Sequence, residues 1–264
     1  ASLFSDKSYL VIENVVGSNL ANILLILGIT AIIGKSLVVD KDIIQIDLPI
    51  LLGSSILLYI ITLDGKIQFL DGFLSIAVLV TYLTYNVKSR RTVEQKALKE
   101  IKKKKKEEKK KEEKEPLNIK YPLILLVSAL FLAFASHWTI VSIEELSILL
   151  NISEGFIVVS ALAIATSLPE LTVSIIAVKQ RKADLAIGNV IGSNIFNTLG
   201  VIGIPAMMGT LIIPPESIDF RIPILLFVTI LFIFTAMDKE ITKWEGITFS
   251  LIYISFIGKL AGFI

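Results

Sequence analysis

Long apolar runs alternate with short polar connections from one end of the chain to the other. A run of about 20 apolar residues is long enough to cross the hydrocarbon core of a bilayer as an α-helix. Such runs predict eight transmembrane helices, over residues 10–33, 46–63, 67–87, 121–141, 153–177, 184–209, 221–237 and 242–263. The predicted fold class is therefore all-α, a polytopic bundle of transmembrane helices.

The fifth apolar run carries a carboxylate, Glu170, in its interior. A charge at membrane depth is costly, so an acidic residue there marks a functional site by default. Pro169 has no N–H group and interrupts the helix, which frees backbone carbonyls that only protein or a cavity can receive. Thr166 lies four residues before Glu170 on the same helix face. Carboxylate, hydroxyl and carbonyl oxygens gathered at one depth suit a hard cation such as calcium.

The sixth apolar run carries a stripe of polar residues, Asn189, Ser193 and Asn197, spaced four apart. This spacing places all three on one face of a helix. The middle of that helix falls near Phe196, and the middle of the fifth falls near Ala165. Both polar sets are therefore expected near the centre of the membrane, where they can meet.

Composition agrees with a membrane protein and narrows the function. The 264 residues are 54% hydrophobic, with a mean hydropathy of +0.77, more than a soluble domain of this size needs. Cysteine is absent, which excludes disulfides and thiolate metal sites. An enzyme is not expected, because the sequence has no HExxH motif and offers no candidate general base for Ser193. No cofactor is expected either.

Basic residues are concentrated between residues 88 and 120, with 15 Lys or Arg and 7 Glu. This segment has almost nothing apolar to bury, so it is predicted to be a solvated linker, and nucleic acid is not an expected partner. Lys and Arg favour the cytoplasmic side of a membrane. Placing the linker in the cytoplasm puts 22 of the 26 basic residues on that side. The prediction is a multi-pass protein of the cell (plasma) membrane with a cytoplasmic linker.

The chain repeats itself. Residues 12–29 read IENVVGSNLANILLILGI, and residues 187–204 read IGNVIGSNIFNTLGVIGI. At a constant offset of 175, the residues Asn14, Gly17, Ser18, Asn19, Asn22, Leu24 and Gly28 recur as Asn189, Gly192, Ser193, Asn194, Asn197, Leu199 and Gly203. The copies lie in the first and the sixth predicted helix, so they run in opposite directions. Inverted-topology repeats with an ion site at the midplane are the plan of many secondary transporters.

The repeat divides the chain into the remainder of a first half (1–87), the charged linker (88–120) and a second half (121–264). The second half opens with two helices, 121–177, that have no counterpart in the first half. We therefore expect an N-terminally truncated sequence, with eight helices present of ten. About 54 preceding residues would hold two apolar spans and a second glutamate that mirrors Glu170.

ATSLPELTVS (from Ala165) followed by IGNVIGSNIFN (from Ile187) resembles the second α-repeat of the calcium/cation antiporters, the sodium/calcium exchanger superfamily. ENVVGSNLANILLILG (from Glu13) resembles the back half of the first α-repeat, and the resemblance covers nearly all of the chain outside the linker. It implies exchange of calcium for sodium by alternating access. The expected partners are therefore Ca²⁺ and Na⁺ ions and the lipid bilayer.

By motif position, the resemblance makes Glu170 the calcium-binding carboxylate. Further oxygens would come from Thr166, Ser167 and Ala163, from Ser193 and Asn197, and from Ser18 and Asn22 in the first half. The chain departs from the family at Ala165 and Glu13, where glycine is usual. Asn197 is aspartate in some relatives, notably potassium-dependent ones, so asparagine argues against potassium transport.

Other interpretations stay open at this stage. A midplane carboxylate can carry a proton as well as a metal ion, so proton/calcium exchange on the same fold is the first alternative function, and a cation channel is the second. Asn22 and Asn197 can serve simply as hydrogen bonds between helices, and Gly188 and Gly192 form a small-residue packing pair. Glu13 is expected to be stabilised by the N-terminal dipole of its helix. The oligomeric state is open, with a monomer as the working assumption.

Overall fold

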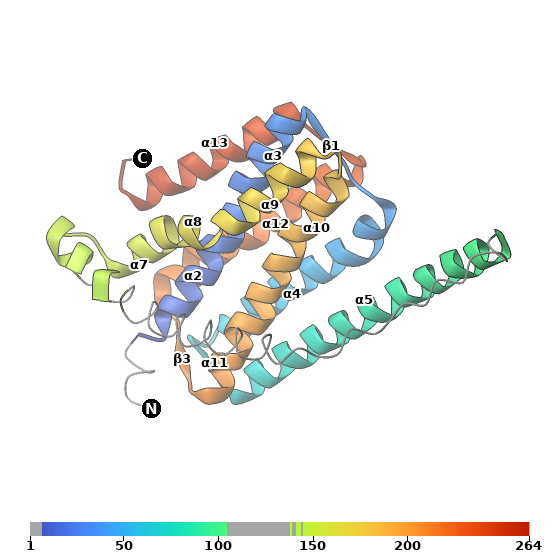
Figure 1. Ribbon diagram of the computed structural model, residues 1–264. Helices are drawn as coiled ribbons and strands as arrows, with labels where there is room; N and C mark the ends of the chain where they lie inside the picture. Colours follow the sequence, from blue (N-terminus) through green and yellow to red (C-terminus); the bar gives the residue numbers. More distant parts are fainter. Residues whose placement is uncertain (1–6, 105–137, 139–140, 144, 264) are drawn as a thin grey trace. The chain divides into compact units, whose positions relative to one another are not determined.

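The computed structural model describes residues 7–104, 138, 141–143 and 145–263 (Figure 1). Residues up to Tyr82 and from Ser153 onward group into one compact unit, and Leu83–Ile152 group into a second. The first unit thus contains both copies of the sequence repeat. The linker from residue 105 onward and most of the predicted span 121–141 lie outside the described residues.

The apolar runs form helices because a helix satisfies its own backbone N–H and C=O groups, which lipid cannot do. The α-helices are α2 (Tyr9–Leu20), α3 (Leu27–Gly34), α4 (Leu48–Thr62), α5 (Phe69–Lys104), α7 (Glu154–Ile157), α8 (Ala163–Thr166), α9 (Leu168–Lys179), α10 (Ala183–Phe196), α11 (Ile202–Met208), α12 (Ile222–Met237) and α13 (Lys243–Leu260). Short π-helical segments adjoin them: η1 (Ala21–Ile26), η2 (Ile43–Asp47), η3 (Val158–Leu162), η4 (Asn197–Val201) and η5 (Ser217–Arg221). The predicted helical bundle is confirmed.

Six stretches of the described chain are long and apolar enough to cross a bilayer. They are Tyr9–Gly34, Ile43–Thr62, Phe69–Val87, Glu154–Lys179, Ala183–Met208 and Ser217–Met237. These six coincide with six of the eight predicted spans. The predicted span 242–263 forms α13, an 18-residue helix with three charged residues, Lys243, Glu245 and Lys259, close to its ends. It is a helix as expected, but a more polar one than the other six.

Four short strands form two antiparallel sheets, which the sequence analysis did not predict. β1 (Ser36–Val38) pairs with β4 (Glu240–Thr242), and β2 (Lys66–Ile67) pairs with β3 (Leu211–Ile212). Under the repeat offset, β1 corresponds to β3 and β2 corresponds to β4. Each sheet therefore joins one half to the other, and a two-fold axis would exchange the two sheets. Figure 1 shows β1 and β3 at opposite ends of the helices, as halves of opposite direction require.

Two pairs of residues that the repeat relates to each other, one of them with a slip of one residue from the offset of 175, are also in direct contact. The hydroxyls of Ser55 and Thr229, 174 positions apart, lie 3.4 Å from each other. Asn19 and Asn194, 175 positions apart, each donate from the side-chain amide to the other's backbone carbonyl, at 3.4 and 3.2 Å. A residue can touch its own repeat partner only close to the two-fold axis, so these pairs mark that axis. The inverted repeat predicted from the sequence is therefore confirmed.

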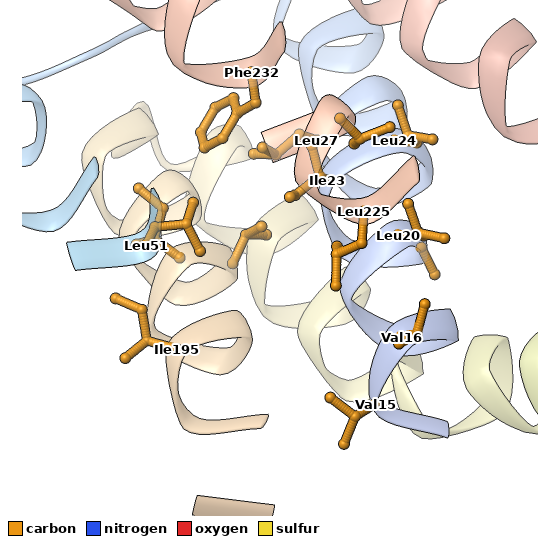
Figure 2. Close-up of a cluster of buried hydrophobic side chains, with 14 of the residues drawn as sticks. Val15, Val16, Leu20, Ile23, Leu24, Leu27, Leu51, Ile195, Leu225 and Phe232 are labelled. Carbon is orange, nitrogen blue, oxygen red and sulfur yellow. The ribbon is translucent and has the colours of Figure 1, made fainter. Parts of the chain in front are cut away.

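The segment Tyr9–Gly34 is the most buried of the six spans. Figure 2 shows its apolar side chains together with those of α4, α10 and α12; the labelled residues are Val15, Val16, Leu20, Ile23, Leu24, Leu27, Leu51, Ile195, Leu225 and Phe232. Between helices in lipid, such contacts stabilise through close van der Waals packing rather than through the hydrophobic effect. This central segment carries the polar residues of the first repeat, so the core fixes where they lie.

Helices approach closely at two glycine pairs that the repeat also relates, since Gly28 recurs as Gly203 at the offset of 175 and Gly72 recurs as Gly246 with a slip of one residue. A Cβ atom added to Gly246 would lie 2.7 Å from the carbonyl oxygen of Gly28. One added to Gly72 would lie 2.7 Å from the carbonyl oxygen of Gly203. These distances leave no room for a side chain, so the α3–α13 and α5–α11 contacts depend on glycine.

Gly188 and Gly192, predicted as a packing pair, have no described atom within 4 Å of an added Cβ. For the part of the chain that the structure describes, that prediction was wrong. The GxxxG spacing shows that two small residues share a helix face, but it does not show that another helix faces them.

Gly246→Ala is expected to lower the stability of the bundle by about 1–3 kcal/mol, because the new methyl group would overlap the Gly28 carbonyl. Gly53→Ala is the matched control, since no described atom lies within 4 Å of its added Cβ, and helix propensity favours alanine there. Thermal unfolding of the purified protein in detergent measures both variants. Equal unfolding temperatures for the two would contradict the close α3–α13 contact.

Candidate functional site

A break in the fifth predicted helix positions the carboxylate. α8 ends at Thr166 and α9 begins at Leu168, with Ser167 between them at φ −95° and ψ 0°. Pro169, in the first turn of α9, lacks the N–H that would continue the hydrogen-bond ladder. Glu170 therefore also lies in the first turn of α9, where the helix dipole favours a negative charge. The predicted interruption beside Glu170 is confirmed.

Glu170 meets the polar stripe of α10, as expected. The Ser193 hydroxyl donates to Oε1 of Glu170 at 3.2 Å, and the Asn189 amide donates to the Glu170 backbone carbonyl at 3.3 Å. The second carboxylate oxygen, Oε2, is buried and accepts no hydrogen bond from the described residues. A buried acceptor without a donor is costly unless a ligand satisfies it. Oε2 is thus available to a cation.

The first half places another group of oxygens beside the same break. Ser18 Oγ lies 3.1 Å from Thr166 Oγ1, which donates to the Ala163 carbonyl at 3.1 Å. Gly17 permits this approach, because a Cβ atom at that position would lie 2.5 Å from the Val159 carbonyl oxygen. Gly17 therefore lets α2 come close enough to α8 for the Ser18 hydroxyl to reach the Thr166 hydroxyl.

Asn22 and Asn197 both lie in π-helical segments, η1 and η4, and such segments often mark functional sites. Asn22 Nδ2 donates to Asn194 Oδ1 at 2.8 Å, and Asn197 Nδ2 donates to Asn19 Oδ1 at 3.1 Å. The hydrogen bonds between helices that the sequence left open are therefore present. They use the nitrogen ends, and Oδ1 of Asn22 is buried with no donor among the described residues.

The structure joins the predicted site residues in separate pairs. The recorded pairs are Glu170 with Ser193, Thr166 with Ser18 and with the Ala163 carbonyl, Asn22 with Asn194, and Asn197 with Asn19. Ser167 is buried at the break itself. Among the described residues no three His, Cys, Asp or Glu side chains cluster, so neutral oxygens would have to supply most of the ligands of a cation here. The role of these residues as ion ligands stays a prediction.

Several polar residues of the repeat were matched in the sequence but not assigned to the site. Asn14 Oδ1 lies 3.5 Å from Thr166 Oγ1, and Asn189 Nδ2 lies 3.3 Å from Ser174 Oγ as well as from the Glu170 carbonyl. Asn19 and Asn194 link the two halves. The signal that could have found them was present, because Asn14, Asn19, Asn189 and Asn194 all recur at the repeat offset.

The two departures from the family sequence lie in different settings. Ala165 is exposed, so its methyl group does not crowd a described helix. Glu13 is fully buried, pairs with the Arg221 guanidinium and accepts a hydrogen bond from the Ser217 hydroxyl. The expectation that the helix dipole stabilises Glu13 was wrong, because the stabilising partner is the Arg221 guanidinium. The sequence feature that could have indicated this ion pair is the basic residue Arg221 at the start of the apolar run 221–237.

Known proteins resemble this chain in sequence and in fold. The family described as sodium/calcium exchanger protein matches residues 1–88 and 120–260. Inner membrane protein YrbG of Escherichia coli K12 is 31% identical over 247 residues, which cover 94% of this chain and 74% of that protein. Sodium/calcium exchanger MaX1 of Methanosarcina acetivorans is 30% identical over 288 residues, which cover 97% of this chain and 81% of that protein. A solved structure of the sodium-calcium exchanger NCX_Mj, soaked with Na⁺ and Sr²⁺, has a TM-score of 0.67 and 27% identity, and covers 96% of this chain and 77% of that one.

Proposed function

The chain belongs to the sodium/calcium exchanger family, and on that premise we propose that it exchanges calcium for sodium across the membrane by alternating access. One observation carries the proposal. The two inverted halves contribute a buried carboxylate oxygen of Glu170 and a buried carboxamide oxygen of Asn22, neither of which has a donor among the described residues. Each half also contributes hydroxyls, Ser18 from the first and Thr166 and Ser193 from the second. The family is one of ion exchangers rather than of enzymes.

Glu170 would supply the charge that a divalent cation needs. Calcium takes six to eight oxygen ligands, so one carboxylate must be supplemented by neutral groups. The proposed supplementary ligands are Thr166, Ser167, Ala163, Ser193, Asn197, Ser18 and Asn22. Sodium, with a single charge, would use the neutral hydroxyl and carboxamide oxygens and leave the carboxylate to calcium.

Ion binding would rearrange the hydroxyls of this site. In the structure the Ser193 hydroxyl donates a hydrogen bond to Glu170, and the Thr166 hydroxyl donates one to the Ala163 carbonyl. A cation between them would attract the oxygen lone pairs of both hydroxyls, so each proton would turn away toward another acceptor. The Ala163 carbonyl would then be released from Thr166 and could itself face the ion.

Alternating access follows from the inverted repeat. Because the two halves run in opposite directions, exchanging their conformations would convert a site open to one side into a site open to the other. Residues near the two-fold axis would remain in the middle throughout. The proposed site satisfies this condition, since Asn22 and Asn197 are bonded to the axial pair Asn19 and Asn194.

The chain is a multi-pass membrane protein, with six spans among the described residues. We place it in the plasma membrane with the linker 88–120 in the cytoplasm. The support is the distribution of charge, because this orientation puts 22 of the 26 Lys and Arg residues on the cytoplasmic side.

Collapsing a sodium gradient is expected to stop calcium movement into proteoliposomes that contain the purified protein, whereas a proton ionophore should leave it unchanged. The reason is that the neutral oxygens of the proposed site can hold sodium, while the Glu170 carboxylate, which could carry a proton, is assigned to calcium. Calcium uptake, followed with a luminal indicator dye, measures both. Loss of uptake with the ionophore alone would establish proton/calcium exchange instead, and uptake that depends on neither gradient would indicate a channel.

A further inference from the structure

Four carboxamides connect the two halves across the two-fold axis. Asn19 and Asn194 are buried and form the inner pair, and Asn22 and Asn197 are bonded to them from outside. All four belong to the sequence repeat, so the bonds themselves are repeated: Asn22 to Asn194 in one direction, Asn197 to Asn19 in the other. The network is therefore built twice by the same local sequence.

The direction of every carboxamide in this network follows from two backbone carbonyls. A carbonyl can only accept, so the side chain of Asn194 must turn its nitrogen toward the Asn19 carbonyl, and the side chain of Asn19 must turn its nitrogen toward the Asn194 carbonyl. Thr198 Oγ1 receives a second bond from Asn19 Nδ2 at 2.8 Å. The two inner carboxamides are left with their oxygens facing outward.

Those outward oxygens determine the outer pair in turn. Asn194 Oδ1 can only accept, so Asn22 must approach it with Nδ2, and it does so at 2.8 Å. Asn19 Oδ1 receives Nδ2 of Asn197 in the same way at 3.1 Å. The oxygen of Asn22 then faces away from the network, buried and without a donor among the described residues.

We propose that Asn19 and Asn194 are positioning residues, which bind no ion themselves but hold Asn197 and Asn22 with their carboxamide oxygens toward the ion site. This inference rests on the proposed function and adds a specific role for the axial pair. An asparagine free to rotate would present its NH₂ group to a cation for part of the time, and a cation is repelled by that end. Fixing the carboxamide keeps the acceptor in place before the ion arrives.

Only a side chain with both a donor and an acceptor can bond to the backbone carbonyl of one half and also orient the outer asparagine. Aspartate at position 194 would accept from Asn22 but could not donate to the Asn19 carbonyl. Leucine would fill the volume and offer neither bond. The same requirement applies at position 19, and asparagine stands at both positions.

A double-mutant cycle between Asn194 and Asn22 tests the inference in the purified protein. Asn22→Ser keeps an oxygen at the site but removes the carboxamide, so nothing remains for Asn194 to orient. Asn194→Ala alone is expected to raise the calcium Kd by about 10–100-fold, the range found for outer-shell partners of metal ligands. In the Asn22→Ser background the same change should alter the Kd by less than about threefold, because the two effects act through one group. Isothermal titration calorimetry with calcium measures all four proteins.

Thr229→Val is the matched control, because it also removes a buried hydrogen bond on the axis, the one to Ser55, without touching the carboxamides. Its calcium Kd should be unchanged. The mirrored cycle, Asn19→Ala with Asn197→Ser, repeats the test if Asn194→Ala does not fold. Equal losses in both backgrounds, or failure of both alanine variants to fold, would overturn the positioning role and leave calcium binding by the unaltered protein intact. If the unaltered protein binds no calcium, the proposed function itself fails.

Discussion

Replacing Glu170 with glutamine should abolish calcium exchange while leaving the protein folded. Glutamine has the same shape and keeps a carbonyl oxygen that can accept from the Ser193 hydroxyl. The change therefore removes the negative charge and little else. Among the described residues Glu170 belongs to no cluster of three or more His, Cys, Asp or Glu side chains, so its charge is a large part of what the site offers a cation.

The expected loss is large because a buried cation would lose the carboxylate that is proposed to balance its charge. Removing one partner of a buried charge pair costs about 3–5 kcal/mol, which corresponds to a loss of at least about 100-fold in affinity. Calcium uptake by proteoliposomes gives the activity, and thermal unfolding shows whether the variant is folded. Glu240→Gln, an exposed carboxylate in β4, is the control and should transport normally. A folded Glu170→Gln protein that exchanged calcium at a near-normal rate would remove Glu170 from the ion site.

The helix break and the meeting of the two polar sets could be predicted from sequence because each depends on local chemistry. Pro169 cannot donate a backbone hydrogen bond wherever it is placed, so the interruption next to Glu170 follows from the residue itself. The contact between Glu170 and Ser193 follows from depth, since two apolar segments of similar length bring their central residues to the same level. The relative direction of the two halves could also be predicted, because an odd number of helices separates the two copies of the repeat.

The carboxamide network and the glycine contacts could not be predicted in the same way. The sequence shows that Asn19 and Asn194 recur. The contact between them also requires both residues to lie near the two-fold axis, and the spacing of residues along the sequence does not show this. The packing glycines proved to include Gly28 and Gly246, which lie in α3 and α13 and form no motif together. Contacts across the axis depend on how the helices tilt and cross, and one segment's pattern carries no information about that.

The ion pair between Glu13 and Arg221 is the other large feature that the sequence analysis missed. Both residues are buried, and they lie in different spans of the bundle, Tyr9–Gly34 and Ser217–Met237. Arg221 also reaches the exposed carboxylate of Glu216 at 3.0 Å. Glu13 Oε2 and Arg221 Nε are nevertheless buried without partners among the described residues. The pair is therefore desolvated but not fully satisfied.

Arg221→Met alone is expected to destabilise the protein by about 3–5 kcal/mol, because it leaves the Glu13 carboxylate buried without its cation. Combining it with Glu13→Leu should restore most of the lost stability, since the uncompensated charge is then gone and two apolar side chains can pack together. The apparent unfolding temperature in detergent ranks the unaltered protein and the two variants. A double variant as unstable as Arg221→Met would mean that the geometry of the ion pair itself holds the two spans together. Recovery would instead show that the cost lies in a lone buried charge, so that this pair adds little net stability to the bundle.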